Sequence, residues 1–362
     1  MKKINSSIFL VIIISIIVGF LSGILGWLVL GVNILNLPFL SQYNFSNAGN
    51  NNNNNRQIVI DQPRSVIVQQ DLQLVQLQNN LLPAMVNIYN ADNTVGEPYL
   101  PSQILGQGFV LTADGWIVTT GDAIKDLKAK YKVVGYQGKE YDFGNFVQDK
   151  ATGLIFGKIN ANNLTVANIG STKDIQVGQT VALISQRDRL NLEHISKIGY
   201  SYASSADIPQ SSETMNKKIF LDTDLDQSYN GAVVASLKGQ ILGIEAGNGI
   251  ILTDYFSNIV NSVLSNTKIS RAELGVTYID LAQVEGMNLV GDKGALLTVD
   301  PDKASTVSGK LKKGDIIKKV NDTELNDYIS SSEVINIYHP GDKVELQFLR
   351  DGKAQSVNVV LN

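Results

Sequence analysis

The sequence contains no cysteine, which excludes disulfide bonds, thiolate metal sites and cysteine nucleophiles. It contains only two histidines, His194 and His339, so few residues are available for histidine-based catalysis. Net charge is also small, because 30 Lys and Arg oppose 34 Asp and Glu to give a formal charge of -4 over 362 residues. This balance lacks the basic domain or stripe that nucleic-acid binding requires, and we expect no nucleic-acid partner. The 44% of hydrophobic residues exclude a wholly disordered chain, and the length indicates two to three domains.

Charged side chains are missing from residues 4–55, and residues 8–32 are almost continuously apolar. A helix of ~20 apolar residues spans the hydrocarbon core of a membrane. The competing interpretation is a signal peptide, but its apolar region is only ~7–15 residues long and we find no cleavage site. Lys2 and Lys3 precede the apolar stretch and the next basic residue is Arg56, so the positive-inside rule makes residues 1–7 a cytoplasmic tail. We predict a single-pass membrane protein whose C-terminal domains are extracytoplasmic.

The remainder of the chain is predicted to be mainly β. Residues 33–65 include an Asn-rich, nearly uncharged stretch that indicates a flexible linker. Residues 66–80 favour a short helix, and residues 254–264 a second helix with Asp254 as its N-cap. Between them, short β-rich runs alternate with turn signals, which is typical of a sandwich or a pair of barrels. We predict strands over residues 85–89, 108–111, 116–119, 132–136, 154–159, 180–184, 219–222, 232–236 and 241–245.

Three motifs resemble the HtrA-type (Deg) trypsin-like serine proteases. Residues 106–120 read GQGFVLTADGWIVTT, and residues 222–244 read DTDLDQSYNGAVVASLKGQILGI. The third motif is C-terminal and resembles a PDZ domain, in residues 294–297 (GALL), 311–321 (LKKGDIIKKVN) and 340–346 (PGDKVEL). The resemblance implies a trypsin-like double β-barrel over residues 66–267 and an α+β PDZ domain over residues 268–362. It also implies serine endopeptidase ancestry, no cofactor, and a homotrimer or a hetero-oligomer with an active relative.

The resemblance also places the catalytic triad, and at each position this chain carries a different residue. Asp122 stands where the family has the catalytic histidine, Gly153 where it has the aspartate, and Tyr229 where it has the serine. Proteolysis of this kind needs a hydroxyl nucleophile, an imidazole that accepts its proton and a carboxylate that orients the imidazole. Gln227 replaces the family's glycine two places before the serine, where a side chain resists the backbone angles of the oxyanion hole. We therefore predict a pseudoprotease.

A displaced residue does not restore the chemistry. Ser228 would be the nucleophile if the loop slipped by one residue, but it has no evident base. His194 matches a strand of the second barrel and His339 a loop of the PDZ domain, both away from the cleft. The acidic run that begins at Asp222 resembles the start of a calcium loop but lacks the glycine and the glutamate of that motif. We predict no metal site.

The PDZ-like segment predicts a site for peptide C-termini or misfolded proteins. A peptide adds to such a domain as an extra strand, and backbone N–H groups hold its carboxylate. Three hypotheses remain open: a scaffold, chaperone or regulator in envelope protein quality control, an active serine endopeptidase, and a structural subunit of an envelope assembly. The alternative for the apolar residues of the groove is that they only fill the PDZ core. The predicted peptide-binding residues are Glu273, Leu274, Gly275 and Val276 beside the carboxylate, with Val334 and Ile337 across the groove on a helix predicted over residues 331–338.

Overall fold

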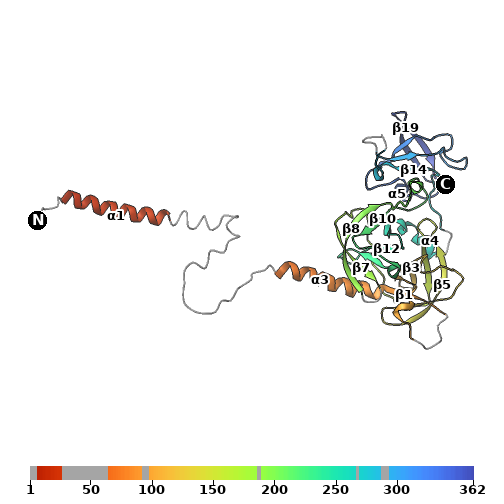
Figure 1. The fold of residues 1–362 in the computed structure, drawn as a ribbon, viewed down its shortest axis with the longest axis horizontal. Coiled ribbons are helices and arrows are strands. Elements are labelled where there is room, and N and C mark those ends of the chain that lie inside the picture. The colour runs from red at the N-terminus through yellow and green to blue at the C-terminus, as the bar shows by residue number, and fades with distance from the viewer. Residues whose placement is uncertain (1–5, 27–63, 92–97, 186–188, 266–268, 287–292) are drawn as a thin grey trace. The chain divides into compact units, whose positions relative to one another are not determined.

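The structure is a computed structural model that describes residues 6–26, 64–91, 98–185, 189–265, 269–286 and 293–362. The chain divides into two compact units, residues 1–62 and residues 63–362. In the first unit, α1 (Ser6–Gly26) is a helix of 21 residues (Figure 1). Among the helices of the described residues, none has both the length and the apolar character needed to cross a membrane. The spanning helix predicted over residues 8–32 is thus not supported, and most of the predicted linker lies outside the described residues.

The second unit begins with α3 (Arg64–Leu81), which includes the helix predicted over residues 66–80. Six antiparallel strands then close into a barrel in the order β1-β2-β3-β6-β5-β4. Gly115 turns the chain between β2 and β3 at φ 103°, and a Cβ there would lie 2.4 Å from the carbonyl oxygen of Ile159. The strands are β1 (Met85–Asn90), β2 (Gly106–Val110), β3 (Trp116–Thr120), β4 (Tyr131–Gly135), β5 (Glu140–Gln148) and β6 (Leu154–Ile159).

A second barrel closes in the order β10-β13-β12-β11-β7-β8. The helix predicted over residues 254–264 is broken into two 3-10 turns, Thr253–Tyr255 and Ser257–Ile259, and the helix α4 (Val260–Leu264). Asp254 is not an N-cap, because it lies inside the first turn and its carboxylate accepts the N–H of Thr172 at 2.9 Å. The strands are β7 (Thr180–Ser185), β8 (Arg189–Gly199), β10 (Lys218–Leu221), β11 (Val233–Ala235), β12 (Ile241–Glu245) and β13 (Ile250–Leu252).

A third sheet has the order β19-β18-β16-β15-β14-β9, with β17 paired to β16. The helix α5 (Ser331–Ile335) begins at the N-cap Ser330, whose side chain accepts the N–H of Glu333. Six of the strands follow the second barrel in sequence, whereas β9 (Gln210–Ser211) comes from the connection between β8 and β10. The others are β14 (Thr277–Asp280), β15 (Ala295–Leu297), β16 (Ile316–Val320), β17 (Thr323–Glu324), β18 (Lys343–Arg350) and β19 (Lys353–Val360).

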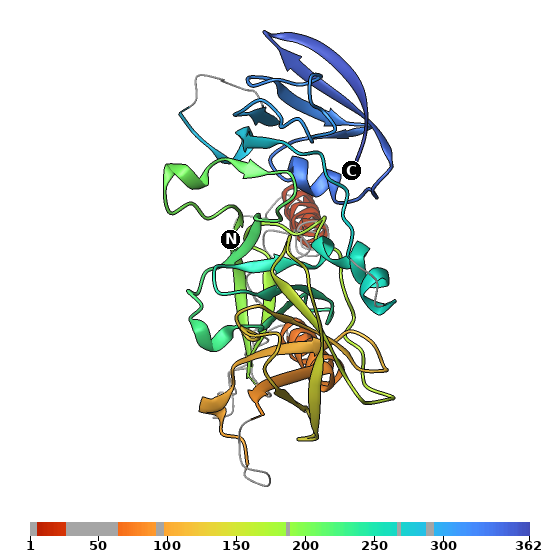
Figure 2. The same cartoon turned by 90° about the vertical axis from the view of Figure 1, so that its right-hand side faces the viewer.

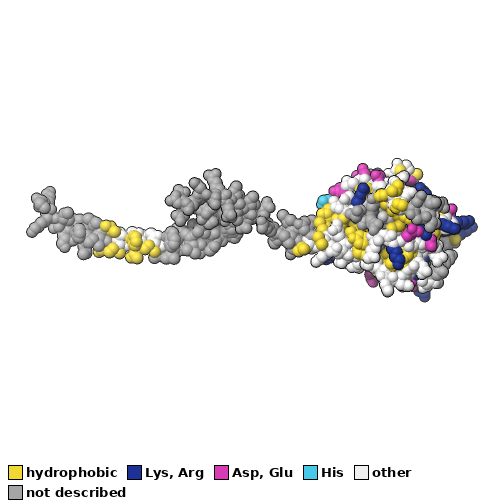
Figure 3. All heavy atoms as spheres, turned by 90° about the horizontal axis from the view of Figure 1, so that it is seen from below, with side chains coloured by type: hydrophobic (Ala, Val, Ile, Leu, Met, Phe, Trp, Pro, Cys, Tyr) yellow, Lys and Arg dark blue, Asp and Glu magenta, His cyan; other side chains and the backbone are white. Residues whose placement is uncertain are grey.

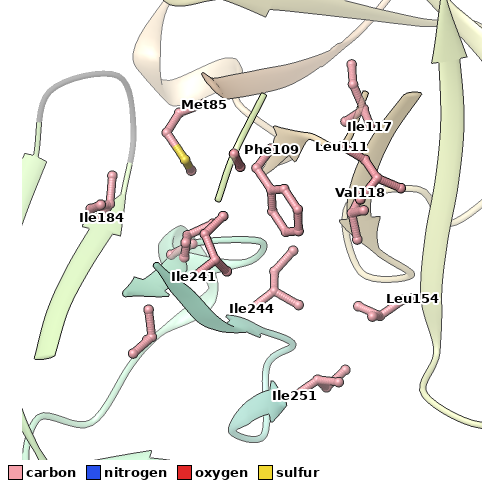
Figure 4. Close-up of a cluster of buried hydrophobic side chains, with 14 of the residues drawn as sticks. Met85, Phe109, Leu111, Ile117, Val118, Leu154, Ile184, Ile241, Ile244 and Ile251 are labelled. Atoms are coloured by element: carbon pink, nitrogen blue, oxygen red, sulfur yellow. The ribbon is translucent and has the colours of Figure 1, made fainter. Parts of the chain in front are cut away.

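Two hydrophobic cores stabilise this unit. The first contains residues of both barrels, and Figure 4 shows side chains of β1, β2 and β3 gathered with those of β7, β12 and β13. The second core lies under the third sheet and takes its residues from 272 to 361. The two barrels therefore form one packed body, and the third sheet is a domain with a core of its own. The fold is mainly β, a double barrel followed by an α+β domain.

Candidate functional site

Loops of the two barrels meet at a cavity of about 330 Å³. The first barrel contributes Asp122 and Lys125, which follow β3. The second contributes residues of two loops, Gln227 and Asn230 before β11 and residues 246–248 after β12. Three of the sequence-predicted positions are close to this cavity: Asp122 and Gln227 line it, and the backbone carbonyl of Gly153 accepts the N–H of Gly121 at 3.1 Å.

Asp122 is exposed at the mouth of this cavity and lies against the second barrel. A Cβ built on Gly247 would lie 2.9 Å from its carboxylate oxygen Oδ2. Two buried polar atoms nearby, Asn230 Oδ1 and Thr120 Oγ1, have no hydrogen-bond partner among the residues that the structure describes. Buried polar atoms without partners are uncommon, so this part of the molecule has unused hydrogen-bonding capacity.

The loop before β11 is a 3-10 turn, Gln227–Tyr229, with Asp226 as its N-cap. The N–H of Tyr229 donates to the carbonyl oxygen of Asp226 at 3.0 Å, and the N–H of Ser228 donates to the Asp226 carboxylate at 2.8 Å. An oxyanion hole requires N–H groups that point at the developing charge. Here two N–H groups of the turn are bonded within it. Gln227 was expected to resist the unusual backbone angles that glycine allows, and its φ is not positive; the left-handed residue of this loop is Gly231, at φ 78°.

Ser228 directly precedes the predicted nucleophile position Tyr229 in the sequence, and its Oγ donates to Asp226 Oδ1 at 2.6 Å. The hydrogen bonds from the Ser228 hydroxyl and N–H lower the pKa of the Asp226 carboxyl. A carboxylate with a lowered pKa is a poorer base for a hydroxyl proton. The two imidazoles pair with other carboxylates: His194 Nδ1 lies 3.2 Å from Asp222, and His339 lies in the third sheet's domain.

The structure adds two charged residues near the cavity that sequence analysis missed. Glu245 ends β12 and is only 2% exposed, and its carboxylate accepts N–H groups from Gly247 and Gly249. Burial raises the pKa of Glu245 and lowers the pKa of Lys218. The signal in the sequence was a glutamate that directly follows the apolar run of β12. The fully described part of the chain holds no cluster of three or more His, Asp or Glu residues arranged for a metal ion.

The predicted peptide-binding residues lie at the start of the third sheet. Leu274 and Val276 are buried in its core, and Gly275 between them has φ 73°. A Cβ at Gly275 would lie 2.9 Å from Ser305, so the loop requires glycine. Glu273 is exposed and its backbone pairs with Asn362, the last residue, through hydrogen bonds of 2.9 and 3.1 Å.

The two residues expected across the groove, Val334 and Ile337, differ in their element and in their exposure. The helix predicted over residues 331–338 ends at Ile335, so it carries Val334 but not Ile337. Val334 is buried in the core of the sheet, and Ile337 is 59% exposed.

Comparisons with known proteins identify both domains. The family model "Trypsin-like peptidase domain" matches residues 106–244, and the model "PDZ domain" matches residues 272–361. A probable periplasmic serine endoprotease DegP-like of Halomonas elongata is 25% identical over 271 residues, which cover 71% of this chain and 56% of that protein. The periplasmic serine endoprotease DegP of Escherichia coli K12 is 24% identical over the same length and with the same shares. The chain therefore spans little more than half the length of these curated relatives.

Solved structures agree on the fold. The HtrA-type protease AlgW with a tripeptide has a TM-score of 0.56 at 20% identity and covers 79% of this chain and 96% of its own. The same protease with a decapeptide has a TM-score of 0.55 at 18% identity, over 79% of this chain and 97% of its own. The likeness to these solved structures concerns the fold alone, and the two family models match its two parts, a trypsin-like peptidase domain followed by a PDZ domain.

Proposed function

We propose that this protein is an extracytoplasmic HtrA/DegP-type binding protein without peptidase activity, and that its PDZ domain captures peptide C-termini or unfolded segments. The observation that carries the proposal is the environment of Ser228, whose hydroxyl donates to the Asp226 carboxylate at 2.6 Å and not to an imidazole. Asp122, Gly153 and Tyr229 at the positions implied for the triad support the same conclusion. Loss of a whole triad costs roughly 10⁶-fold in kcat.

A second candidate function is serine endopeptidase activity, because the curated relatives carry that name. In that case the turn Gln227–Tyr229 would have to open, release the N–H of Tyr229 and bring a base to Ser228. The described geometry provides a carboxylate there, and the lowered pKa of Asp226 makes that carboxylate a weak base. The scaffold, chaperone or regulator role in protein quality control is therefore the function that we favour.

Labelling with a fluorophosphonate, which reacts with activated serine hydroxyls, tests the proposal. We expect no stoichiometric labelling of the full-length chain and no cleavage of unfolded casein. Ser228→Ala is the matched control and is expected to leave both results unchanged. Stoichiometric labelling that Ser228→Ala abolishes would establish the endopeptidase function and refute ours.

Location and assembly form part of the same proposal. The name "periplasmic" of the curated relatives supports an extracytoplasmic location. On the face of the molecule shown in Figure 3, acidic and basic side chains are interspersed, which is unlike a nucleic-acid surface. Membrane attachment through residues 8–32 rests on the sequence alone, and a homotrimer or a hetero-oligomer with an active relative rests on the resemblance. Carbonate extraction of membranes and sedimentation of the purified chain test these two points.

A further inference from the structure

The edge of the PDZ sheet where a peptide would add is already occupied by the chain itself. Strand β14 follows the loop at Gly275, and β9 pairs with it antiparallel, with Thr277 opposite Ser211 and Tyr278 opposite Gln210. In Figure 2 the green segment that holds β9 extends from the barrels to the blue strands of the PDZ domain. Because the pairing is antiparallel, the segment runs toward the loop that precedes β14, as a bound peptide C-terminus would.

Three hydrogen bonds continue this pairing beyond β9. The N–H of Ser212 donates to the carbonyl of Val276 at 3.0 Å, and the N–H of Val276 donates to Ser212 Oγ at 3.1 Å. At the loop itself, the N–H of Gly275 donates to the side-chain carboxylate of Glu213 at 2.8 Å. A carboxylate held by a backbone N–H of this loop is the contact that a peptide C-terminus makes with such a domain.

We propose that residues 210–213 are an internal ligand of the PDZ groove, in which the Glu213 side chain replaces the terminal carboxylate of a peptide. The inference rests on the proposed peptide-binding function and adds its regulation. A peptide with a free carboxylate must displace this segment before it can pair with β14. Ser212 is small and polar, so a peptide with an apolar last residue buries apolar surface that the internal segment does not.

The internal segment is held on both sides of the groove. After Glu213, the N–H of Met215 donates to the carbonyl of Ala151 at 3.1 Å, in the loop that carries Gly153. Lys217, with a side chain 3% exposed, lies 3.1 Å from the Glu333 carboxylate of α5. Displacement of residues 210–213 is therefore expected to disturb the contacts of Met215 with the loop that carries Gly153 and of Lys217 with the helix α5.

Covalent attachment makes the segment an effective competitor. A tethered ligand has an effective concentration of the order of millimolar, without the loss of translational freedom that a free peptide pays. The apparent dissociation constant of a peptide is raised by the inverse of the fraction of molecules whose groove is open. If the groove is open about one tenth of the time, removal of the internal contacts increases the peptide affinity about tenfold.

Three variants of the full-length chain test the proposal. Glu213→Ala removes the carboxylate, and Ser212→Pro removes the N–H that pairs with Val276. Glu324→Ala is the matched control, because it removes an exposed carboxylate from β17 of the same domain. The probe is an array of peptides with random last four residues, each present with a free and with an amidated C-terminus.

We expect Glu213→Ala and Ser212→Pro to bind free-carboxylate peptides at least about tenfold more tightly than the unchanged chain does. Glu324→Ala should bind as the unchanged chain does, and amidated peptides should bind weakly to every chain. Equal affinities for the unchanged chain and both groove variants would overturn the internal-ligand inference while leaving peptide capture intact.

Hydrogen exchange of the Gly275 and Val276 amides gives a second readout that needs no peptide. We expect slow exchange of both amides in the unchanged chain and faster exchange in Glu213→Ala, with the other core amides of the PDZ domain unchanged. Fast exchange of both amides in the unchanged chain would contradict the inference. If both amides are protected and then released by Glu213→Ala, the internal contact is supported. Absence of peptide binding by any variant would then refute the proposed function and not the contact.

Discussion

Replacement of Asp280 by asparagine is predicted to stabilise the protein at neutral pH. Asp280 ends β14, is 5% exposed, and caps the next turn through the N–H of Ala282 at 3.1 Å. Its Oδ2 lies 3.4 Å from the hydroxyl of the buried Tyr200. Burial raises the pKa of Asp280 from 3.8 to about 6, despite the opposing effects of the Ala282 N–H and of Lys217. Asparagine keeps the capping oxygen and removes the buried charge.

The sign and size of the effect follow from this raised pKa. The folded state binds the Asp280 proton more tightly than the unfolded state does, so the free energy of unfolding falls as the pH rises from about 4 to about 6. The pKa of Asp280 differs by about 2 between the folded and the unfolded state, which lowers the free energy of unfolding by about 3 kcal/mol at pH 7.5 and by about 1 kcal/mol at pH 4.5. From pH 4.5 to pH 7.5, the free energy of unfolding of Asp280→Asn should therefore rise by about 2 kcal/mol relative to that of the unchanged chain.

Urea unfolding at pH 4.5 and 7.5, followed by tryptophan fluorescence and circular dichroism, measures this gain. Asp302→Asn makes the same chemical change at an exposed position of the same domain and should show no such difference. Unfolding free energies of the Asp280→Asn and unchanged chains that stay parallel across this pH range would refute the argument. In that case desolvation of Asp280 is not the source of the shift.

The guanidinium of Arg271 lies 2.6 Å from the Asp149 carboxylate, which is only 2% exposed. Arg271→Ala leaves that buried carboxylate without its partner, so it should destabilise the protein by about 3–5 kcal/mol in urea unfolding. Lys132→Ala breaks a pair with the largely exposed Asp142 and should cost less than about 1 kcal/mol; similar losses for both variants would contradict the burial argument. Gly231→Ala should prevent folding or lower Tm by more than about 10 °C, because the new Cβ would lie 2.0 Å from the backbone oxygen of Gln107. A Tm equal to that of the unchanged chain would show that the loop can rearrange.

Sequence analysis predicted the strands whose side chains are buried on both faces. The ranges of β6 and β12 agree with the predicted residues 154–159 and 241–245, because both are apolar runs bounded by turn signals. Strand β5 was missed, since its residues are mostly polar and partly exposed. Its pairing with β6 shifts register after Gly144, and Asn145 has φ 52°, so the alternation that marks a strand is interrupted there.

The candidate site was accessible to sequence analysis only in part. The resemblance located Asp122 and Gln227, which line one cavity, and Gly153, whose carbonyl accepts the N–H of the residue before Asp122. The hydrogen bonds within the turn at Ser228 depend on backbone geometry that no motif encodes. The pairing of β9 with β14 was equally hidden, because two polar residues carry no strand signal and their partners lie 66 or more positions later in the chain.

The pairing of β9 with β14 means that the PDZ domain is not a separable piece of this chain. A fragment that starts at the boundary between the two cores would leave the edge of β14 without its neighbour, and an open strand edge invites pairing between molecules. Such a fragment would also lack Glu213, so titrations with it would report affinities that the intact protein does not have. A genetic fusion or a crystallisation fragment of this domain is best designed with residues 204–217 attached, because the strand that completes its sheet is encoded before the last strands of the second barrel.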